Sequence, residues 1–120
     1  MQEVLAVYLF GSYAHGSPRP NSDIDLGLLF DTEDRNVIAD KLESYNNALA
    51  RMLRKQIHLT GLNAASPLLL KQVLSKGRCI LANEPKKHAL FQMAALGKIA
   101  DFGIYKSKFE QEFARKLVHG

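Results

Sequence analysis

The sequence has a single cysteine, Cys79, among its 120 residues. One cysteine cannot form an internal disulfide or supply a zinc site built from several thiolates. No apolar run approaches the ~20 residues that a helix needs to cross a bilayer, and the first residues show no basic flank and no cleavage site typical of a signal peptide. These absences argue against a secreted disulfide-rich fold, a membrane protein and a zinc finger, and they predict a cytoplasmic protein.

Internal repeats, low-complexity tracts and proline- or serine-rich linkers are also missing. Hydrophobic residues make up 47% and charged residues 23% of the chain, which is ordinary globular composition. We therefore expect one folded domain over residues 1–120, in which residues 84–120 form a C-terminal helical region.

Acidic residues are scarce in the second part of the chain. Residues 1–50 hold three basic and eight acidic side chains, whereas residues 51–120 hold thirteen basic and four acidic ones. This asymmetry has two interpretations: a cation site in the first part with an anionic partner for the second, or a solvated helix surface with dispersed lysines. Nothing in the sequence is typical of a motif that reads a DNA groove, so we expect no specific nucleic-acid partner.

Short apolar runs bounded by turn residues predict strands at residues 5–10, 24–30, 55–62 and 78–81. Apolar residues at steps of three and four predict a helix over residues 35–53. A second helix is predicted from Ser66-Pro67 to Gly77, and a third helical region from Asn83-Glu84-Pro85 onward. The expected fold class is therefore α/β (α+β), with a small mixed β-sheet flanked by helices.

The stretch LFGSYAHGSPRPNSDIDLGL, over residues 9–28, carries the chemistry. Asp23 and Asp25 begin the second predicted strand, and residues two apart on a strand point to the same face. Two carboxylates on one face repel each other and are costly to desolvate, unless a divalent cation lies between them. Mg²⁺ prefers one or two carboxylates together with water and phosphate oxygens.

Gly11 and Ser12 follow the first predicted strand directly. A glycine lets backbone N–H groups approach an anion closely, and the serine hydroxyl adds a donor. In the segment that follows, Arg19 is either a phosphate contact or a solvated loop residue, and Ser22 bonds either a phosphate or the backbone. Together these residues indicate a site for a metal-bound nucleoside triphosphate, although no P-loop lysine follows the glycines.

The pattern Gly-Ser, ten residues, Asp-x-Asp resembles the signature of the polymerase β-like nucleotidyltransferase superfamily. The segment FGSYAHGSPRPNSDIDL more closely resembles the minimal nucleotidyltransferases, and the later segment IHLTGLNAASPLLLKQVLSKGRCILANEP is similar to the strand, helix and short strand of that family. The resemblance covers about residues 4–85. It implies a mixed sheet flanked by helices and transfer of a nucleotidyl group with release of pyrophosphate.

By this resemblance, Gly11 and Ser12 would hold the triphosphate, and Asp23 and Asp25 would hold the metal. It further implies ATP as substrate, Mg²⁺ or alternatively Mn²⁺ as the ion, and a HEPN-type toxin as the protein partner. Many members of the family are antitoxins, and some attach AMP to a tyrosine of the toxin. Such chemistry needs mainly positioning and charge neutralisation.

His58 departs from the family pattern, because the superfamily carries a third carboxylate on a later strand where this chain has Ile57-His58-Leu59. No acidic residue lies between Glu43 and Glu84. Imidazole is a poor Mg²⁺ ligand, a fair one for Mn²⁺ or Zn²⁺, and a base near neutral pH. Three interpretations stay open: a catalytic His58, a structural His58, and a weakened enzyme that binds nucleotide and neutralises its toxin by occlusion.

Two further features bear on partners. The family has a helix before the first strand, and none precedes it here, so we expect exposed apolar surface that favours a partner or a homodimer. Near the end of the chain, Phe102, Tyr105, Phe109, Phe113 and Leu117 recur at steps of three or four. This stripe predicts an amphipathic helix that packs either on its own sheet or on a partner helix.

Overall fold

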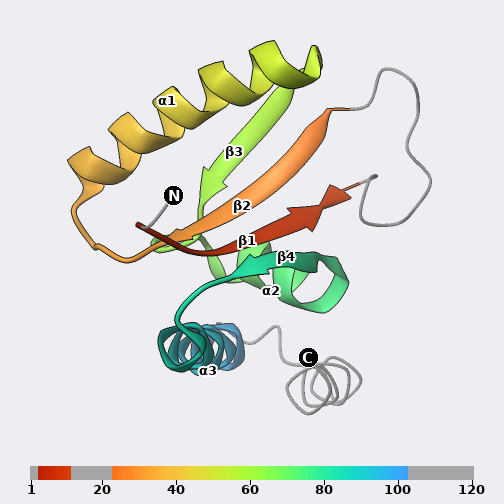
Figure 1. The fold of residues 1–120 in the computed structure, drawn as a ribbon. Helices are drawn as coiled ribbons and strands as arrows, with labels where there is room; N and C mark the ends of the chain where they lie inside the picture. The colour runs from red at the N-terminus through yellow and green to blue at the C-terminus, as the bar shows by residue number, and fades with distance from the viewer. Residues whose placement is uncertain (1–2, 12–22, 103–120) are drawn as a thin grey trace.

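The computed structural model describes residues 3–11 and 23–102, and it shows a mixed sheet with helices on both faces (Figure 1). Ser12, Arg19, Ser22 and the apolar stripe beyond Phe102 therefore lie outside the described residues. The described strands are β1 (Val4–Phe10), β2 (Ile24–Phe30), β3 (Ile57–Gly61) and β4 (Arg78–Ala82), and the helices are α1 (Arg35–Leu53), α2 (Pro67–Lys76) and α3 (Pro85–Asp101). This confirms the expected α+β class.

The strand order in the sheet is β3-β2-β1-β4. β1 pairs antiparallel with both β2 and β4, whereas β3 pairs parallel with β2. The two antiparallel pairings bring the end of β1 beside the starts of β2 and β4, and the parallel pairing adds the start of β3 to the same end of the sheet. Four chain segments that are distant in sequence therefore meet at that end.

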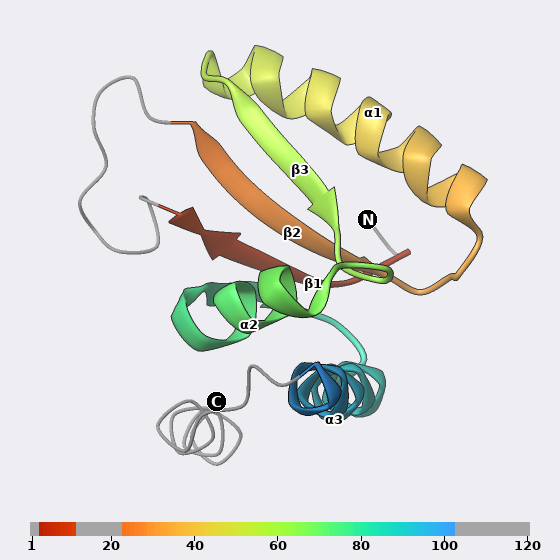
Figure 2. The same cartoon turned by 180° about the vertical axis from the view of Figure 1, so that it is seen from behind.

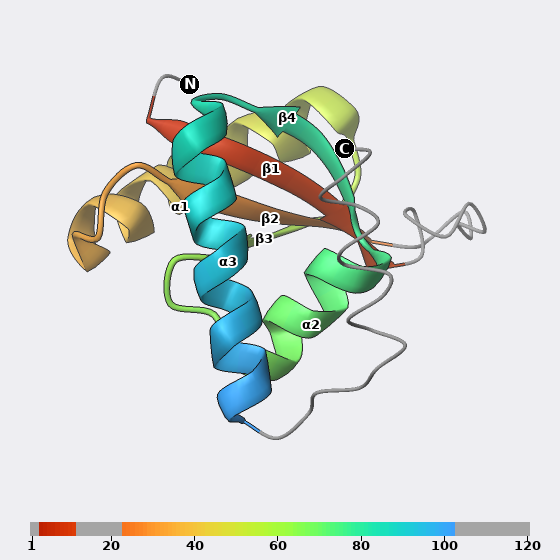
Figure 3. The same ribbon diagram turned by 90° about the horizontal axis from the view of Figure 1, so that it is seen from below.

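Each face of the sheet is covered by its own helices. α1 lies over one face, and α2 and α3 lie against the other (Figures 1 and 2). On the α1 face the buried residues are Val4, Val7, Leu28 and Phe30, packed against Ile38, Leu42 and Tyr45 of the helix. The larger cluster on the α2 and α3 face contains Tyr8, Phe10, Leu29, Leu62, Leu70, Val73, Leu74, Ala95 and Ile99. Figure 3 shows α2 and α3 beside each other on the same side of the sheet.

Side chains cap the starts of α1 and α2, and the cap of α2 at Ser66 is the one that the sequence predicted. The Asp34 carboxylate accepts hydrogen bonds from the backbone N–H groups of Asn36 and Val37 at the start of α1. Ser66 Oγ accepts from the N–H of Leu69 at 3.2 Å, and Pro67 occupies the first turn of α2. These bonds satisfy donors that have no partner inside the helix.

One expectation needs correction. The predicted strand at residues 55–62 is shorter in the structure, because ladder pairing covers only Ile57–Gly61. In the first strand, Val4 and Ala6 are fully buried, because β1 is a central strand between two partners. The most exposed large apolar side chains among the described residues are instead on helices, with Met52 at 77%, Leu90 at 66% and Met93 at 65% exposed. No described helix is both long and apolar enough to span a membrane.

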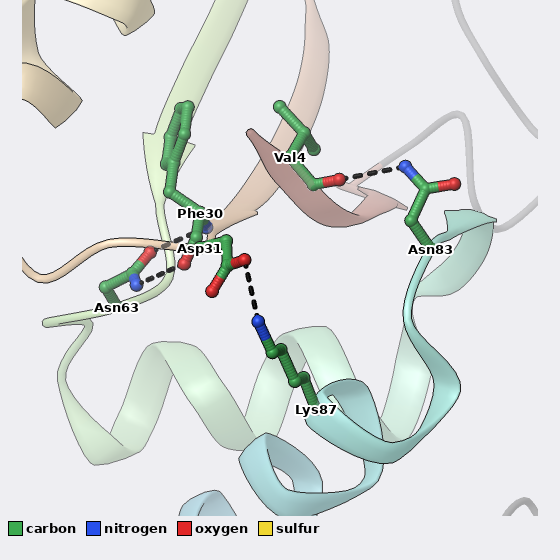
Figure 4. Close-up of polar contacts among 6 residues, drawn as sticks. All are labelled: Val4, Phe30, Asp31, Asn63, Asn83 and Lys87. Atoms are coloured by element: carbon green, nitrogen blue, oxygen red, sulfur yellow. Dashed lines mark hydrogen bonds and ion pairs between the residues drawn. The ribbon is translucent and has the colours of Figure 1, made fainter. Parts of the chain in front are cut away.

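At the end of the sheet away from the predicted site, Asn63 closes the turn after β2 (Figure 4). Its Oδ1 accepts from the N–H of Phe30 at 2.9 Å, while Nδ2 donates to the carbonyls of Phe30 at 2.8 Å and Thr32 at 3.0 Å. Nearby, Lys87 Nζ lies 2.9 Å from Asp31 Oδ2 and joins α3 to the end of β2. Asn63 thus supplies hydrogen-bond partners for three backbone groups at this end.

We expect Asn63→Ala to lower the free energy of unfolding by about 1–3 kcal/mol, because it leaves these partly buried backbone groups without their partner. The exposed Asn47 on α1 offers a matched control, and Asn47→Ala should change stability by less than about 0.5 kcal/mol. Urea denaturation of both variants measures the difference. Equal stability of the two variants would contradict the role given to Asn63.

Candidate active site

The predicted site residues that the structure describes lie at one end of the sheet. In the strand register, Phe10 of β1 lies opposite Asp25, and Asp25 lies beside His58 of β3. Paired residues on neighbouring strands point to the same face. Phe10, Asp25 and His58 therefore share the face that carries α2 and α3. Asp23 lies two residues before Asp25, which is the spacing at which strand residues point to the same face.

Gly11 lies directly against the Asp25 carboxylate. Its φ is +75°, in the left-handed region that disfavours residues with a side chain. A Cβ built at this position would clash with Oδ2 of Asp25. Gly11 therefore lets the chain leave β1 with its backbone close beside Asp25.

Asp23 is held by a partner from another strand. Nε2 of His58 lies 2.8 Å from Oδ2 of Asp23, and the two side chains are 52% and 43% exposed. Because both groups are half exposed, solvent weakens the attraction, and the pair adds little to stability. Its consequence is geometric, since it places an imidazole nitrogen beside one of the two predicted metal-binding carboxylates.

The face of β2 opposite the two carboxylates is apolar, as the sequence predicts. Leu28 is buried on the α1 side, and Leu26 packs partly buried on the same cluster. Asp25 and Leu26 are both of intermediate exposure, so β2 passes from solvent at its start to the core at its end. This gradient holds the carboxylates rigidly at the surface while the rest of the strand is fixed by packing.

The donor set suits a divalent cation. Two carboxylates and an imidazole are ordinary ligands for such an ion, and the 2.8 Å between Asp23 Oδ2 and His58 Nε2 is close to the ~3.0 Å that separates adjacent ligands around an octahedral ion with bonds of ~2.1 Å. Among the described residues no three such side chains already converge on one point, because Asp25 lies against Gly11 while Asp23 lies against His58.

Sequence reasoning missed the basic residues that surround this end of the sheet. Arg54 and Lys55 immediately precede β3, and Lys76 and Arg78 lie where α2 ends and β4 begins. All four are exposed. The strand directions bring both pairs to the end that carries the carboxylates, where their positive charge attracts anions. The sequence signal for these four residues is a pair of basic side chains near the start of each of two strands. Combined with the strand directions, this signal would have placed them at the site.

Comparison with known proteins agrees with this geometry. The family described as "Polymerase beta, Nucleotidyltransferase" matches residues 1–86, which include all of the strands and the Gly11, Asp23, Asp25 and His58 positions. The chain belongs to this nucleotidyltransferase family. The predicted resemblance and the predicted fold are thereby confirmed.

Proteins similar to this chain include members of toxin–antitoxin pairs. It is 40% identical over 73 residues to the protein adenylyltransferase MntA of Shewanella oneidensis, an alignment that covers 60% of this chain and 50% of MntA. The match thus spans about half the length of that curated relative. A crystal structure of a toxin–antitoxin with AMP-PNP is similar, with 25% identity, a TM-score of 0.68, and coverage of 98% of this chain and 89% of that one.

A further solved structure supports the fold alone. It is a complex of the tri-AMPylated HEPN toxin of Shewanella oneidensis with an MNT antitoxin, matched at 22% identity with a TM-score of 0.61. The match covers 98% of this chain and 86% of that chain.

Gly11→Ala tests the close approach at Asp25. We expect a loss of about 1–3 kcal/mol in the free energy of unfolding, because alanine is strained at this φ and its Cβ displaces the carboxylate. Gly97 in α3 is the matched control, since a Cβ there has no neighbour within 4 Å and Gly97→Ala should stabilise the helix by about 0.5–1 kcal/mol. Chemical denaturation measures both. Opposite signs are expected, and equal effects would contradict the account of Gly11.

Proposed function

We propose that this protein transfers AMP from ATP to a protein acceptor, with a divalent cation held by Asp23 and Asp25, and that it is the antitoxin of a HEPN-type toxin. The observation that carries the proposal is that, in a chain of this family, one end of the sheet holds Gly11, Asp23, Asp25 and His58 together. The 40% identity to the adenylyltransferase MntA supports AMP as the transferred group.

Each residue has a role that follows from its position. Asp23 and Asp25 would hold Mg²⁺ or Mn²⁺, and the ion would neutralise charge on the triphosphate and on the leaving pyrophosphate. Gly11, whose backbone at φ +75° can come close to an anion, would contribute N–H donors to the phosphates. Ser12, Ser22 and Arg19, which lie outside the described residues, complete the predicted nucleotide site. The cations that precede β3 and β4 favour the approach of an anionic substrate.

The acceptor hydroxyl attacks the α-phosphorus of ATP, a P–O bond to the acceptor forms, and the bond to pyrophosphate breaks. The acceptor proton must leave as this happens. His58, half exposed beside Asp23, is the proposed acceptor of that proton. A tyrosine of the partner toxin is the proposed acceptor, in keeping with the tri-AMPylated HEPN toxin in the similar complex.

His58 also supports a second candidate function. If the missing third carboxylate abolishes transfer, the chain binds nucleotide and neutralises its toxin by covering it. The observation that favours this alternative is the contact between Nε2 of His58 and Oδ2 of Asp23, because a metal bound there would compete with the imidazole for this oxygen. The two functions differ in whether the toxin becomes labelled.

Transfer is tested with purified protein, α-labelled ATP and the product of the adjacent gene, in Mg²⁺ and in Mn²⁺. We expect label on the partner that falls by at least about 100-fold in Asp23→Asn/Asp25→Asn, because that variant loses the cation-binding charge. Asp40→Asn/Glu43→Gln removes the same charge from the exposed surface of α1 and should leave transfer unchanged. A stable complex that carries no label would instead support occlusion.

His58→Asp separates the two functions further. If His58 limits the chemistry by replacing a carboxylate, this variant should transfer AMP in Mg²⁺ about tenfold faster or more, because the hard ion gains an oxygen ligand. The rate with saturating ATP and partner measures the effect. A rate no higher than that of the parent would refute the idea that this substitution limits activity.

A further inference from the structure

We infer that the outward face of α3 binds the chain's own C-terminal segment, residues 104–118, as a returning helix. The outward face consists of Leu90, Met93, Gly97 and Ala100, all of them exposed. This contact is independent of the proposed function. Three features support it: the exposure of the outward face, the sequence pattern of the segment that follows α3, and the match between the two in length and register.

α3 is apolar on two opposite sides. Ala95 is 2% exposed and packs in the core on the α2 and α3 face of the sheet. Residues two positions before and after it lie on the opposite side of a helix, so Met93 and Gly97 face away from the core, and Leu90 and Ala100 continue that side at steps of three. Figure 3 is seen from below, where the side of α3 away from the sheet faces the viewer. A helix that is apolar on both sides needs a partner for the second side.

The outward face is open and carries no charge along its centre. Leu90 and Met93 are 66% and 65% exposed, which places them among the most exposed large apolar side chains of the described residues. A Cβ added at Gly97 would have no neighbour within 4 Å, so a side chain from another helix can come close to the backbone there. No Asp, Glu, Lys or Arg lies between Lys87 and Lys98. This surface is therefore suited to an apolar helix.

The segment that follows α3 has one apolar side in its sequence. α3 ends at Asp101, and residues 103–120 lie outside the described residues. The large apolar side chains of this segment recur at steps of four, at Tyr105, Phe109, Phe113 and Leu117. That spacing predicts one stripe along a helix. Gly103 follows the end of α3 directly, where a glycine commonly ends a helix and lets the chain turn.

The two stripes agree in length. At a rise of ~1.5 Å per residue, the outward face from Leu90 to Ala100 spans ~15 Å, and residues 105–117 span ~18 Å as a helix. Residues 102–104 are enough to connect two antiparallel helices, because such connections need only about two to five residues. The segment can therefore return along α3 without a long loop.

An antiparallel return also sets large side chains against open positions. Counted from a turn at residues 102–104, three facing pairs result: Phe109 with Gly97, Phe113 with Met93, and Leu117 with Leu90. The ring of Phe109 then fills the space that is open at Gly97, and Phe113 contacts the thioether of Met93, which is a favourable sulfur–aromatic pair. Every large side chain of the outward face thus gains an apolar partner.

The tether favours this segment over any separate molecule. Because only a few residues join it to α3, its effective concentration at the outward face is of about millimolar order or higher. A second copy of the chain, or a partner protein, has to reach that concentration to compete.

The test measures how accessible position 93 is in the full chain. In a Cys79→Ser background, Met93→Cys supplies a single thiol, and its rate of reaction with a maleimide is compared with that of Asn47→Cys on the exposed surface of α1. We expect the thiol at position 93 to react at least about tenfold more slowly, because it is labelled only when the segment opens. Adding Phe109→Asp/Phe113→Asp should abolish this protection, because carboxylates are costly to bury.

Gln111→Asp is the matched control for the added charge. Position 111 is two residues from both Phe109 and Phe113, on the opposite side of the predicted helix, so this variant should keep the protection. Circular dichroism checks that every variant retains the fold. A thiol at position 93 that reacts as fast as the one at position 47, or protection that survives both aspartates, would overturn the inference.

Dilution separates the possible occupants of the outward face. Protection by the chain's own segment does not depend on protein concentration, whereas protection by a second copy falls as the protein is diluted. Protection that falls on dilution would refute the intramolecular contact and assign the face to a dimer. Protection that appears only after the product of the adjacent gene is added would refute it as well and assign the face to that partner.

Discussion

The register of β2 between its two neighbours is the constraint on which the site depends. An antiparallel partner on one side places Asp25 opposite Phe10 and against Gly11, and a parallel partner on the other side places it beside His58. A slip of one residue in either pairing would turn the carboxylates toward α1 and move Leu26 and Leu28 out of their packing against α1. Packing of the apolar side chains of β2 thus determines which way its carboxylates point.

Charge at this end of the sheet is balanced by side chains from separate segments. The carboxylates of Asp23 and Asp25 stay near solvent, so neither bears the full cost of desolvation. His58 lies 2.8 Å from Asp23 and sets an imidazole nitrogen beside this carboxylate. Such an arrangement keeps two like charges close together and leaves them accessible to a cation and to an anionic nucleotide.

Much of the architecture could be predicted because it follows from local sequence patterns. The bounds of β2 and α1 agree with the predicted ranges, since alternating apolar residues and helical periodicity are both strong there. Ser66 and Pro67 likewise predicted the start of α2, because helix capping needs no tertiary contact. The Asp-x-Asp alternation was enough to place both aspartates on one face.

Contacts between distant segments could not be read from the sequence. The 2.8 Å pair of Asp23 and His58 joins residues that only the parallel register of β2 and β3 brings together. The basic residues near the starts of β3 and β4 can be placed beside the carboxylates only once the strand directions are known. Asn63 gave no signal, because a side chain that closes a turn by bonding three backbone groups looks like any polar loop residue.

The central claim is that one end of this sheet holds a divalent cation and a nucleotide together. A crystal structure of the protein with Mn²⁺ and a non-hydrolysable ATP analogue, with data collected at the manganese absorption edge, tests it most directly. The account predicts an anomalous peak within coordination distance of Asp23 and Asp25, with the phosphates beside Gly11. A peak elsewhere, or bound nucleotide with the Asp23–His58 pair intact and no metal at the aspartates, would contradict it.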